Sequence, residues 1–170
     1  MAAINVPASA EPPRVVDLVG LERYMGRWYE IAALPNFFRR HCVRDTTVDY
    51  ELREDGLVSV KNRCVDERGD IDEAEGVARP ADPTATAKLE VSVVSVFGNY
   101  LFWGDYWIIG LGPDYDYALV ATPTRCWGWI LSRYPQPPRQ LIEGWLHQFR
   151  DQGYDPNAFV LTVQSTGNSL

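Results

Sequence analysis

The chain has 170 residues, of which 46% are apolar and 12% aromatic, and its formal net charge is −7. This length suits one domain with a full hydrophobic core, and the apolar content excludes a disordered polymer. The acidic balance argues against nucleic-acid binding, because a phosphate backbone needs clustered cations and the chain holds only Lys61 and Lys88 as lysines. The compact basic group at residues 39–41 is interpreted as a solvated loop.

The ends of the chain carry no targeting signal that we can identify. Residues 1–14 are small, polar and proline-bearing, without the apolar centre of a signal peptide. No apolar run reaches the ~18 residues that a membrane-spanning helix needs. We expect a flexible tail over residues 1–14, one folded domain over residues 15–165, and a second tail over residues 166–170.

Alternation of apolar and polar residues predicts a series of short strands. A helical turn over residues 16–25 leads into the first strand, where Gly26 stands two residues before Trp28. Further strands are expected over residues 46–52, 57–64, 71–78, 88–93, 106–111, 117–121 and 127–133, with a last short one over 158–163. An aromatic loop over residues 97–104 precedes the sixth strand.

One helix is expected, over residues 138–152. Two prolines open it, an apolar stripe that includes Trp145 and Phe149 runs along it, and Gly153 closes it.

Eight strands joined by short turns, then one helix and a trailing strand, are typical of an antiparallel up-and-down β-barrel. A two-layer β-sandwich fits the same period and is the alternative. Several inward positions are aromatic or polar, notably Tyr50, Asn62, Tyr106 and Trp129. Because a solid core favours Leu, Ile and Val, we expect an all-β, eight-stranded barrel that encloses a ligand cavity.

Three separated segments resemble the signature regions of the lipocalin family. They are Gly26-x-Trp28 in the first strand, residues 114–120 at a turn into the seventh, and Leu131-Ser132-Arg133 at the end of the eighth. The run Trp-Ile-Leu-Ser-Arg at residues 129–133 is most similar to the bacterial outer-membrane lipocalin and its apolipoprotein D relatives. The likeness covers residues 15–165, although Pro113 stands where the family often has threonine.

The resemblance implies a calyx, open at one end, that binds a small hydrophobic molecule for storage or transport without catalysis. It also implies that the helix over residues 138–152 lies on the outside of the barrel, with its apolar stripe covering the sheet. In the family, the residue matching Trp28 packs at the closed end beneath the one matching Arg133, so Gly26, Trp28 and Arg133 have structural roles. We expect a fatty acid or lysophospholipid to enter tail first, with its head at the open rim and Phe37 near the mouth. The inward phase of the strands predicts the wall residues Tyr50, Val60, Val91, Tyr106, Val120 and Trp129, strand alternation adds Glu30, and Trp103 is expected at the mouth. Together these eight are the predicted ligand-binding residues.

Glu30 follows Trp28 by two residues, so strand alternation places it on the cavity side. A carboxylate there needs a hydrogen-bond partner, or its pKa rises through desolvation. Two roles stay open. Glu30 bonds a neighbouring hydroxyl or water, or it excludes fatty carboxylates from the cavity floor.

The three cysteines, Cys42, Cys64 and Cys126, are interpreted as too few and too scattered for a disulfide scaffold or a zinc cluster. At most one bridge can form, and free thiols are equally open. In apolipoprotein D relatives, a cysteine at the position of Cys42 pairs with one near the C-terminus. No cysteine follows Cys126 here, so that bridge cannot form.

Two other functions stay open on the same barrel. A lipid-modifying, isomerase-like enzyme would need an acid–base pair, for which Glu30 with Tyr50 or Tyr106 is the candidate. A haem or tetrapyrrole carrier would need an axial ligand, but His41 sits in the first loop and His147 in the helix, neither near a cysteine or carboxylate set. We therefore expect no catalytic residue, no metal site and no cofactor.

The expected partner is a hydrophobic small molecule, bound by a monomer or homodimer. By resemblance the protein is periplasmic, associated with the outer membrane, or extracellular, while the missing signal peptide leaves a cytoplasmic location open. The cysteine that carries the lipid anchor of bacterial members has no counterpart here, so membrane association would need a leader or anchor outside this sequence.

Overall fold

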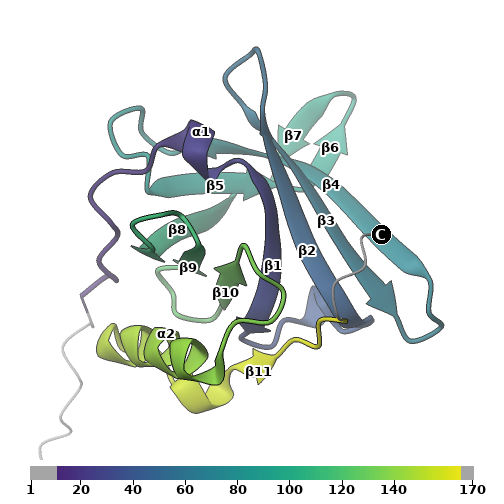
Figure 1. Cartoon of the computed structure of the whole chain (residues 1–170). Helices are drawn as coiled ribbons and strands as arrows, with labels where there is room; N and C mark the ends of the chain where they lie inside the picture. Colours follow the sequence, from purple (N-terminus) through teal and green to yellow (C-terminus); the bar gives the residue numbers. More distant parts are fainter. Residues whose placement is uncertain (1–10, 166–170) are drawn as a thin grey trace, which may run out of the picture.

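The computed structural model describes residues 11–165, and its main sheet closes into an antiparallel barrel (Figure 1). The barrel strands are β1 (Gly26–Ala33), β2 (Cys42–Leu52), β3 (Val58–Asp66), β4 (Ile71–Pro80), β5 (Lys88–Ser92), β8 (Gly104–Leu111), β9 (Tyr117–Ala121) and β10 (Gly128–Ser132). They pair in the order β10-β9-β8-β5-β4-β3-β2-β1, and β1 pairs again with β10. That last pairing excludes the sandwich and confirms the predicted eight-stranded barrel.

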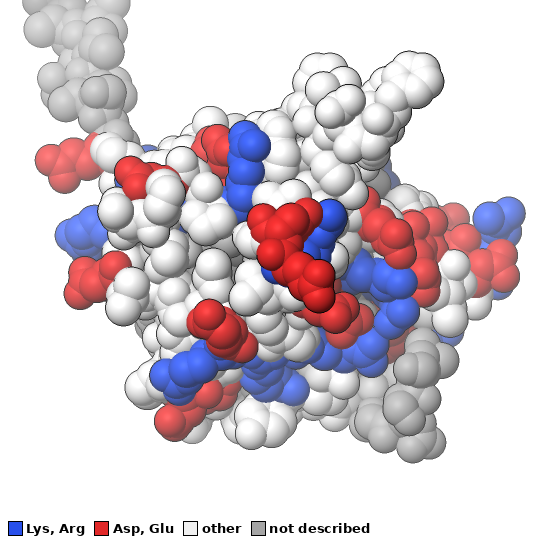
Figure 2. Space-filling model, turned by 90° about the horizontal axis from the view of Figure 1, so that it is seen from above, with Lys and Arg blue, Asp and Glu red and all other residues white. Residues whose placement is uncertain are grey.

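Three further strands are not part of the closed ring of eight. β6 (Val94–Val96) and β7 (Asn99–Leu101) form a separate hairpin where an irregular loop was expected. In Figure 2 this hairpin projects at the upper right as a lobe without charged side chains. β11 (Val160–Leu161) pairs with β1, and the short helix η2 (Pro156–Ala158) occupies the start of the segment expected as a longer last strand.

Helix α2 (Arg139–Asp151) covers one outer side of the barrel, as predicted (Figure 1). Pro138 stands at its N-cap, and Gly153 follows its end with a φ of 88°, a left-handed conformation that favours glycine. The buried Trp145 and Phe149 pack in one cluster with Leu119, which belongs to β9. Each such buried side chain contributes about 1.5–3 kcal/mol of hydrophobic stabilisation.

The two faces of each strand have separate environments, as β3 illustrates. Val58 and Val60 are buried in the barrel interior. Lys61 and Arg63 alternate with them and form ion pairs on the outer surface, with Glu75 and Asp49 respectively. The alternation in the sequence therefore predicted correctly which side of the sheet these residues face.

Two short helices and the chain start complete the described structure. α1 (Leu21–Tyr24) precedes β1 at one end of the barrel, and η1 (Phe37–Arg39) lies in the loop between β1 and β2. Residues 1–10 and 166–170 of the expected tails lie outside the described residues. Within residues 11–14, the backbone N–H of Arg14 donates to the side chain of Gln152. Between residues 11 and 165 no helix combines the length and apolar character that crossing a bilayer requires.

Candidate functional site

Arg133 and Trp28 stack on each other at the end of the barrel where α1 lies. The guanidinium carbon of Arg133 is 3.8 Å from the centre of the Trp28 ring, and its Nη1 donates to the Arg27 carbonyl at 2.9 Å. Trp28 is fully buried. Gly26 has a φ of 96°, and a Cβ there would approach Arg133 Nη1 at 3.2 Å. This packing matches the structural role that the resemblance implied for Gly26, Trp28 and Arg133.

A chain of three tyrosine hydroxyls fills the barrel interior beside Trp28. Tyr106 Oη lies 2.9 Å from Tyr24 Oη and 2.7 Å from Tyr50 Oη, within hydrogen-bond distance of both. Desolvation raises the pKa of all three tyrosines, so that their hydroxyls stay protonated at neutral pH. This part of the interior is therefore a packed and hydrogen-bonded layer.

Six of the eight predicted ligand-binding residues belong to the interior cluster around Trp28 or pack against it. They are Tyr50, Val60, Val91, Tyr106, Val120 and Trp129. Their inward orientation agrees with the alternation of the sequence. Contact between these residues and a ligand stays a prediction.

Trp103 lies in a different place from the other predicted residues. Its ring is 3.7 Å from the guanidinium carbon of Arg79, and Arg79 also forms an ion pair with Glu90. Arg79 follows the interior residue Ala78, so alternation turns Arg79 to the outer surface of the sheet. The structure thus stacks Trp103 on an outward arginine, and contact between Trp103 and a ligand at the mouth stays a prediction.

A cavity of about 330 Å³ lies where β1, β2 and β11 meet beside the η1 loop. The register of β1 shifts between Glu30 and Ala32, and that of β2 shifts between Arg44 and Thr47. β11 lies beside these irregular stretches and pairs with the end of β1. The cavity is lined by Glu30, Ala33, Leu34, Pro35, Asn36, Phe37, Arg39, Arg40, Cys42, Val43, Thr46, Val160, Leu161 and Thr162. Of the eight predicted ligand-binding residues, only Glu30 is in this set, and Phe37 lines the cavity as well.

Glu30 has a specific partner in the wall of this cavity. Its carboxylate accepts a hydrogen bond of 2.6 Å from the Thr162 hydroxyl. Desolvation raises the pKa of Glu30, while the Thr162 bond and the positive charge of Arg39 act in the opposite direction. Tyr50 and Tyr106 are bonded to each other instead. The acid–base pair that an isomerase would need is therefore not assembled by hydrogen bonds.

Polar groups that the sequence pattern did not single out also line the cavity. Arg39 and Arg40, interpreted from sequence as part of a solvated loop, contribute positive charge to its wall. The side-chain Oδ1 of Asn36 is buried and has no hydrogen-bond partner among the described residues. In the sequence, only the adjacent arginines could have indicated this cavity. The strand that completes it, β11, is more than 100 residues away from β1 along the chain.

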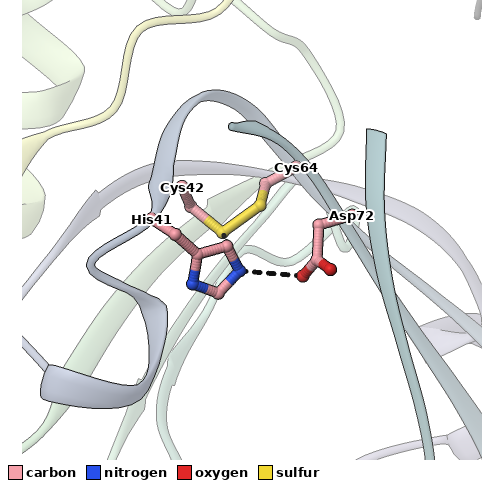
Figure 3. Close-up of side chains that lie close together, drawn as sticks. All are labelled: His41, Cys42, Cys64 and Asp72. Atoms are coloured by element: carbon pink, nitrogen blue, oxygen red, sulfur yellow. Dashed lines mark hydrogen bonds and ion pairs between the residues drawn. A yellow bond between two sulfur atoms is a disulfide. The ribbon is translucent and has the colours of Figure 1, made fainter. Parts of the chain in front are cut away.

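His41 lies in a cluster of potential ligand atoms, contrary to expectation. Its Nε2 is 2.9 Å from Asp72 Oδ2 and 3.8 Å from Cys42 Sγ, and Cys42 is bonded to Cys64 in a disulfide (Figure 3). The prediction that neither histidine sits near a cysteine or carboxylate set is therefore wrong for His41. It failed because the pairing of β2, β3 and β4 brings Cys64 and Asp72 to His41 and its sequence neighbour Cys42. Cys126 is a free, exposed thiol.

Comparison with known proteins agrees with the barrel and its signature residues. A family model described as a lipocalin-like domain matches residues 19–164. Temperature-induced lipocalin-1 of Arabidopsis thaliana is 38% identical over 156 residues, which cover 89% of this chain and 82% of the relative. Outer membrane lipoprotein Blc of Escherichia coli K12 is 35% identical over 161 residues, covering 92% and 88%.

One further relative and one solved structure are also similar to this chain. Apolipoprotein D of Rattus norvegicus is 33% identical over 139 residues, covering 76% of this chain and 69% of the relative. Insecticyanin of Manduca sexta superposes with a TM-score of 0.70 at 22% identity, covering 91% of this chain and 85% of that one, which shows a shared fold. With the closed barrel, the Trp28–Arg133 stack and these matches together, the chain belongs to the lipocalin family.

Proposed function

We propose that the chain binds a single-chain lipid, a fatty acid or a lysophospholipid, as a non-catalytic carrier or store. Lipocalin membership indicates binding or transport of a small hydrophobic ligand, and homologous lipocalins are generally binding proteins. The observation that carries the finer proposal is the cavity beside η1, where apolar walls are combined with Arg39 and Arg40.

The size of the cavity favours one acyl chain. Small-molecule sites in proteins measure about 300–1,000 Å³, and this cavity of about 330 Å³ is at the lower end. Leu34, Val43 and Leu161 supply apolar wall. Each methylene group buried against such a wall contributes about 0.8 kcal/mol before ordering costs, which is sufficient for micromolar binding of a long chain.

Charge in the cavity wall favours an anionic head group next to η1. Arg39 and Arg40 are adjacent in the loop, and guanidinium groups match carboxylate and phosphate geometry. Glu30 sits in the wall with its carboxylate bonded to Thr162. Because an ionised Glu30 repels a second carboxylate, it keeps the lipid head away from its own part of the cavity.

Asn36 favours a head group that can donate a hydrogen bond. Asn36 is one of the lining residues, and its buried Oδ1 accepts no hydrogen bond within residues 11–165, so rotation of the side chain would turn this oxygen into the cavity. A glycerol hydroxyl of a lysophospholipid can donate to this oxygen, whereas an ionised fatty carboxylate cannot. We therefore rank a lysophospholipid ahead of a fatty acid of the same chain length.

Displacement of a fluorescent fatty acid, followed with intrinsic tryptophan quenching, tests the proposal. Palmitate and a palmitoyl lysophospholipid are each expected to displace the probe in a saturable way. Arg39→Ala with Arg40→Ala is expected to weaken about 10-fold the binding of both lipids, whose heads carry a carboxylate or a phosphate, while leaving the binding of hexadecanol, which lacks charge, unaffected. Arg44→Ala is the matched control, because Arg44 is exposed and absent from the cavity wall.

A second variant tests the ranking of the two lipids. Asn36→Leu is expected to remove the preference for lysophospholipid over palmitate. No saturable displacement by any of the three lipids would reject the lipid-carrier function. If the double arginine variant weakened the binding of palmitate and of hexadecanol equally, the placement of the head group beside Arg39 and Arg40 would be rejected.

The disulfide supports an extracytoplasmic location, which we also propose. Disulfides persist mainly in oxidising compartments, and Cys42 is joined to Cys64. The relative from E. coli is named an outer membrane lipoprotein. Cell fractionation followed by thiol alkylation of the native protein tests this, because a cytoplasmic protein with reduced Cys42 and Cys64 would contradict it.

A further inference from the structure

Four side chains with metal-ligating atoms converge at the start of β2 (Figure 3). They are His41, Cys42, Cys64 and Asp72, and one ligand atom from each lies within 4.8 Å of all the others. Cys64 stands directly opposite Asp72 in the β3–β4 pairing, so two of the four are held by adjacent strands. His41 and Asp72 are both about half exposed, which leaves the cluster open to solvent.

The distances suit a tetrahedral metal site once the sulfur atoms separate. Zinc bound by sulfur, nitrogen and oxygen at about 2.0–2.3 Å places its ligands about 3.3–3.8 Å apart. Cys42 Sγ and His41 Nε2 are already 3.8 Å apart. The Cα atoms of Cys42 and Cys64 are 5.5 Å apart, so side-chain rotation can open the sulfurs without moving the strands far.

The disulfide decides whether this cluster can hold a metal, because only thiolates are strong ligands. Two molecules of a thiol reductant break the Cys42–Cys64 bond and are themselves joined in a disulfide. Each protein sulfur receives one electron and one proton. A divalent cation then displaces both thiol protons, and His41 presents a ring nitrogen lone pair to it in place of its contact with Asp72.

We propose that His41, Cys42, Cys64 and Asp72 form a zinc-class metal site that is available only when the disulfide is reduced. Two thiolates, one imidazole and one carboxylate make a soft, four-ligand set of the kind that zinc prefers. Two thiolates and one carboxylate around a divalent cation leave one net negative charge. Arg39, whose Nη2 donates to Cys42 Sγ at 3.5 Å, lies where it offsets that charge.

The site would cross-link the strands in two alternative ways, by the disulfide or by the metal. In an oxidising compartment the disulfide joins β2 to β3, and in a reducing one the metal joins β2, β3 and β4. Since Cys42 also lines the cavity beside η1, the exchange takes place in the cavity wall itself. The metal site does not depend on which lipid occupies that cavity.

Cobalt titration of the whole chain tests the proposal, with a phosphine reductant that does not itself compete as a thiol ligand. Reduced protein is expected to bind one equivalent of Co²⁺ with thiolate-to-cobalt charge-transfer absorption, which Zn²⁺ then abolishes. Oxidised protein is expected to show no such absorption. Reduced protein carrying both His41→Ala and Asp72→Asn should bind at least 100-fold more weakly.

Two variants serve as matched controls. His147→Ala removes an exposed histidine of α2, and Cys126→Ser removes the free thiol, and neither should change the affinity. Near-UV circular dichroism checks that the reduced protein stays folded. The proposal is overturned by an absence of saturable cobalt binding in the reduced chain, or by equal binding in the His41/Asp72 variant. Binding by the oxidised form, or only by unfolded protein, overturns it as well.

Discussion

The guanidinium of Arg133 covers the face of Trp28 at 3.8 Å and also bonds backbone carbonyls in three segments of the chain. Its N–H groups donate to the carbonyls of Arg23 in α1, Arg27 in β1 and Tyr115 in the turn before β9. A cation–π contact of this kind is worth about 1–2 kcal/mol when desolvated. One side chain therefore links α1, β1 and the turn between β8 and β9 at the same end of the barrel.

Arg133→Ala is expected to lower the free energy of unfolding by about 2–4 kcal/mol, because it removes the stack and leaves several carbonyls without their donor. Arg133→Lys keeps the positive charge but loses the planar guanidinium with its several N–H donors, so it should recover less than half of this loss. Urea denaturation measures both. Arg139→Ala, with a side chain 91% exposed, should change stability by less than about 0.5 kcal/mol. Equal effects at the two positions would contradict the role of Arg133.

Glu30→Gln is expected to stabilise the protein at neutral pH. Desolvation holds the pKa of Glu30 above its ordinary 4.5, so the folded chain binds this proton more tightly than the unfolded chain. Wild-type stability therefore falls as pH rises from 4.5 through the raised pKa, by about 1.4 kcal/mol for each unit of elevation. The glutamine variant lacks this loss.

Urea denaturation at several pH values measures this difference. The increase in the free energy of unfolding that Glu30→Gln produces should be largest near pH 8 and should vanish near pH 4. Glu51→Gln changes an exposed glutamate of β2 in the same way and serves as the control. A gain that does not grow with pH would show that desolvation of Glu30 is not its source.

Replacing both Cys42 and Cys64 with serine is expected to lower the free energy of unfolding by about 3 kcal/mol. The two cysteines are 22 residues apart, and closing a loop of that length in the unfolded chain gives an effect of this size. Metal-free wild type treated with reductant should lose the same amount. Cys126→Ser provides the comparison, because its exposed thiol forms no bridge. If the serine pair were as stable as wild type, the disulfide would not contribute to stability.

Phe97→Asn is expected to stabilise the β6–β7 hairpin by about 1 kcal/mol. Phe97 and Gly98 form its two-residue loop with φ values of 50° and 78°, a backbone that strongly favours the sequence Asn-Gly. Phe97 is 99% exposed, so its ring contributes no packing that the variant could lose. Amide hydrogen exchange in β6 and β7 should slow about 5-fold, while Phe97→Val should accelerate it because a β-branched residue fits this backbone poorly. No slowing in the asparagine variant would contradict the turn geometry.

Much of the fold was predictable because it depends on local patterns. The period-2 alternation that places Val58 and Val60 inside and Lys61 outside is visible within one strand, and so is the apolar stripe of α2. The eight barrel strands and the helix followed from such patterns. The hairpin at residues 94–101 did not, because its turn contains a phenylalanine where asparagine or glycine is usual.

The candidate site was less predictable, since it depends on contacts between distant segments. Alternation assigned Tyr50 and Tyr106 to the interior, but it cannot tell whether opposite walls touch, and there the hydroxyls meet. The cavity lies instead where register shifts in β1 and β2 coincide with the approach of β11. Irregularities of this kind leave no periodic signal in the sequence.

The sequence alone determined the all-β architecture and indicated the family, because strand alternation and the Gly26, Trp28 and Arg133 signature can be recognised in the chain itself, whereas closure of the sheet was decided by the pairing of β1 with β10. Only the tertiary structure decided where the cavity lies, that Cys42 pairs with Cys64, and that His41 meets Asp72. Those relationships depend on the register between strands, which is set by the packing of the whole barrel rather than by any one segment.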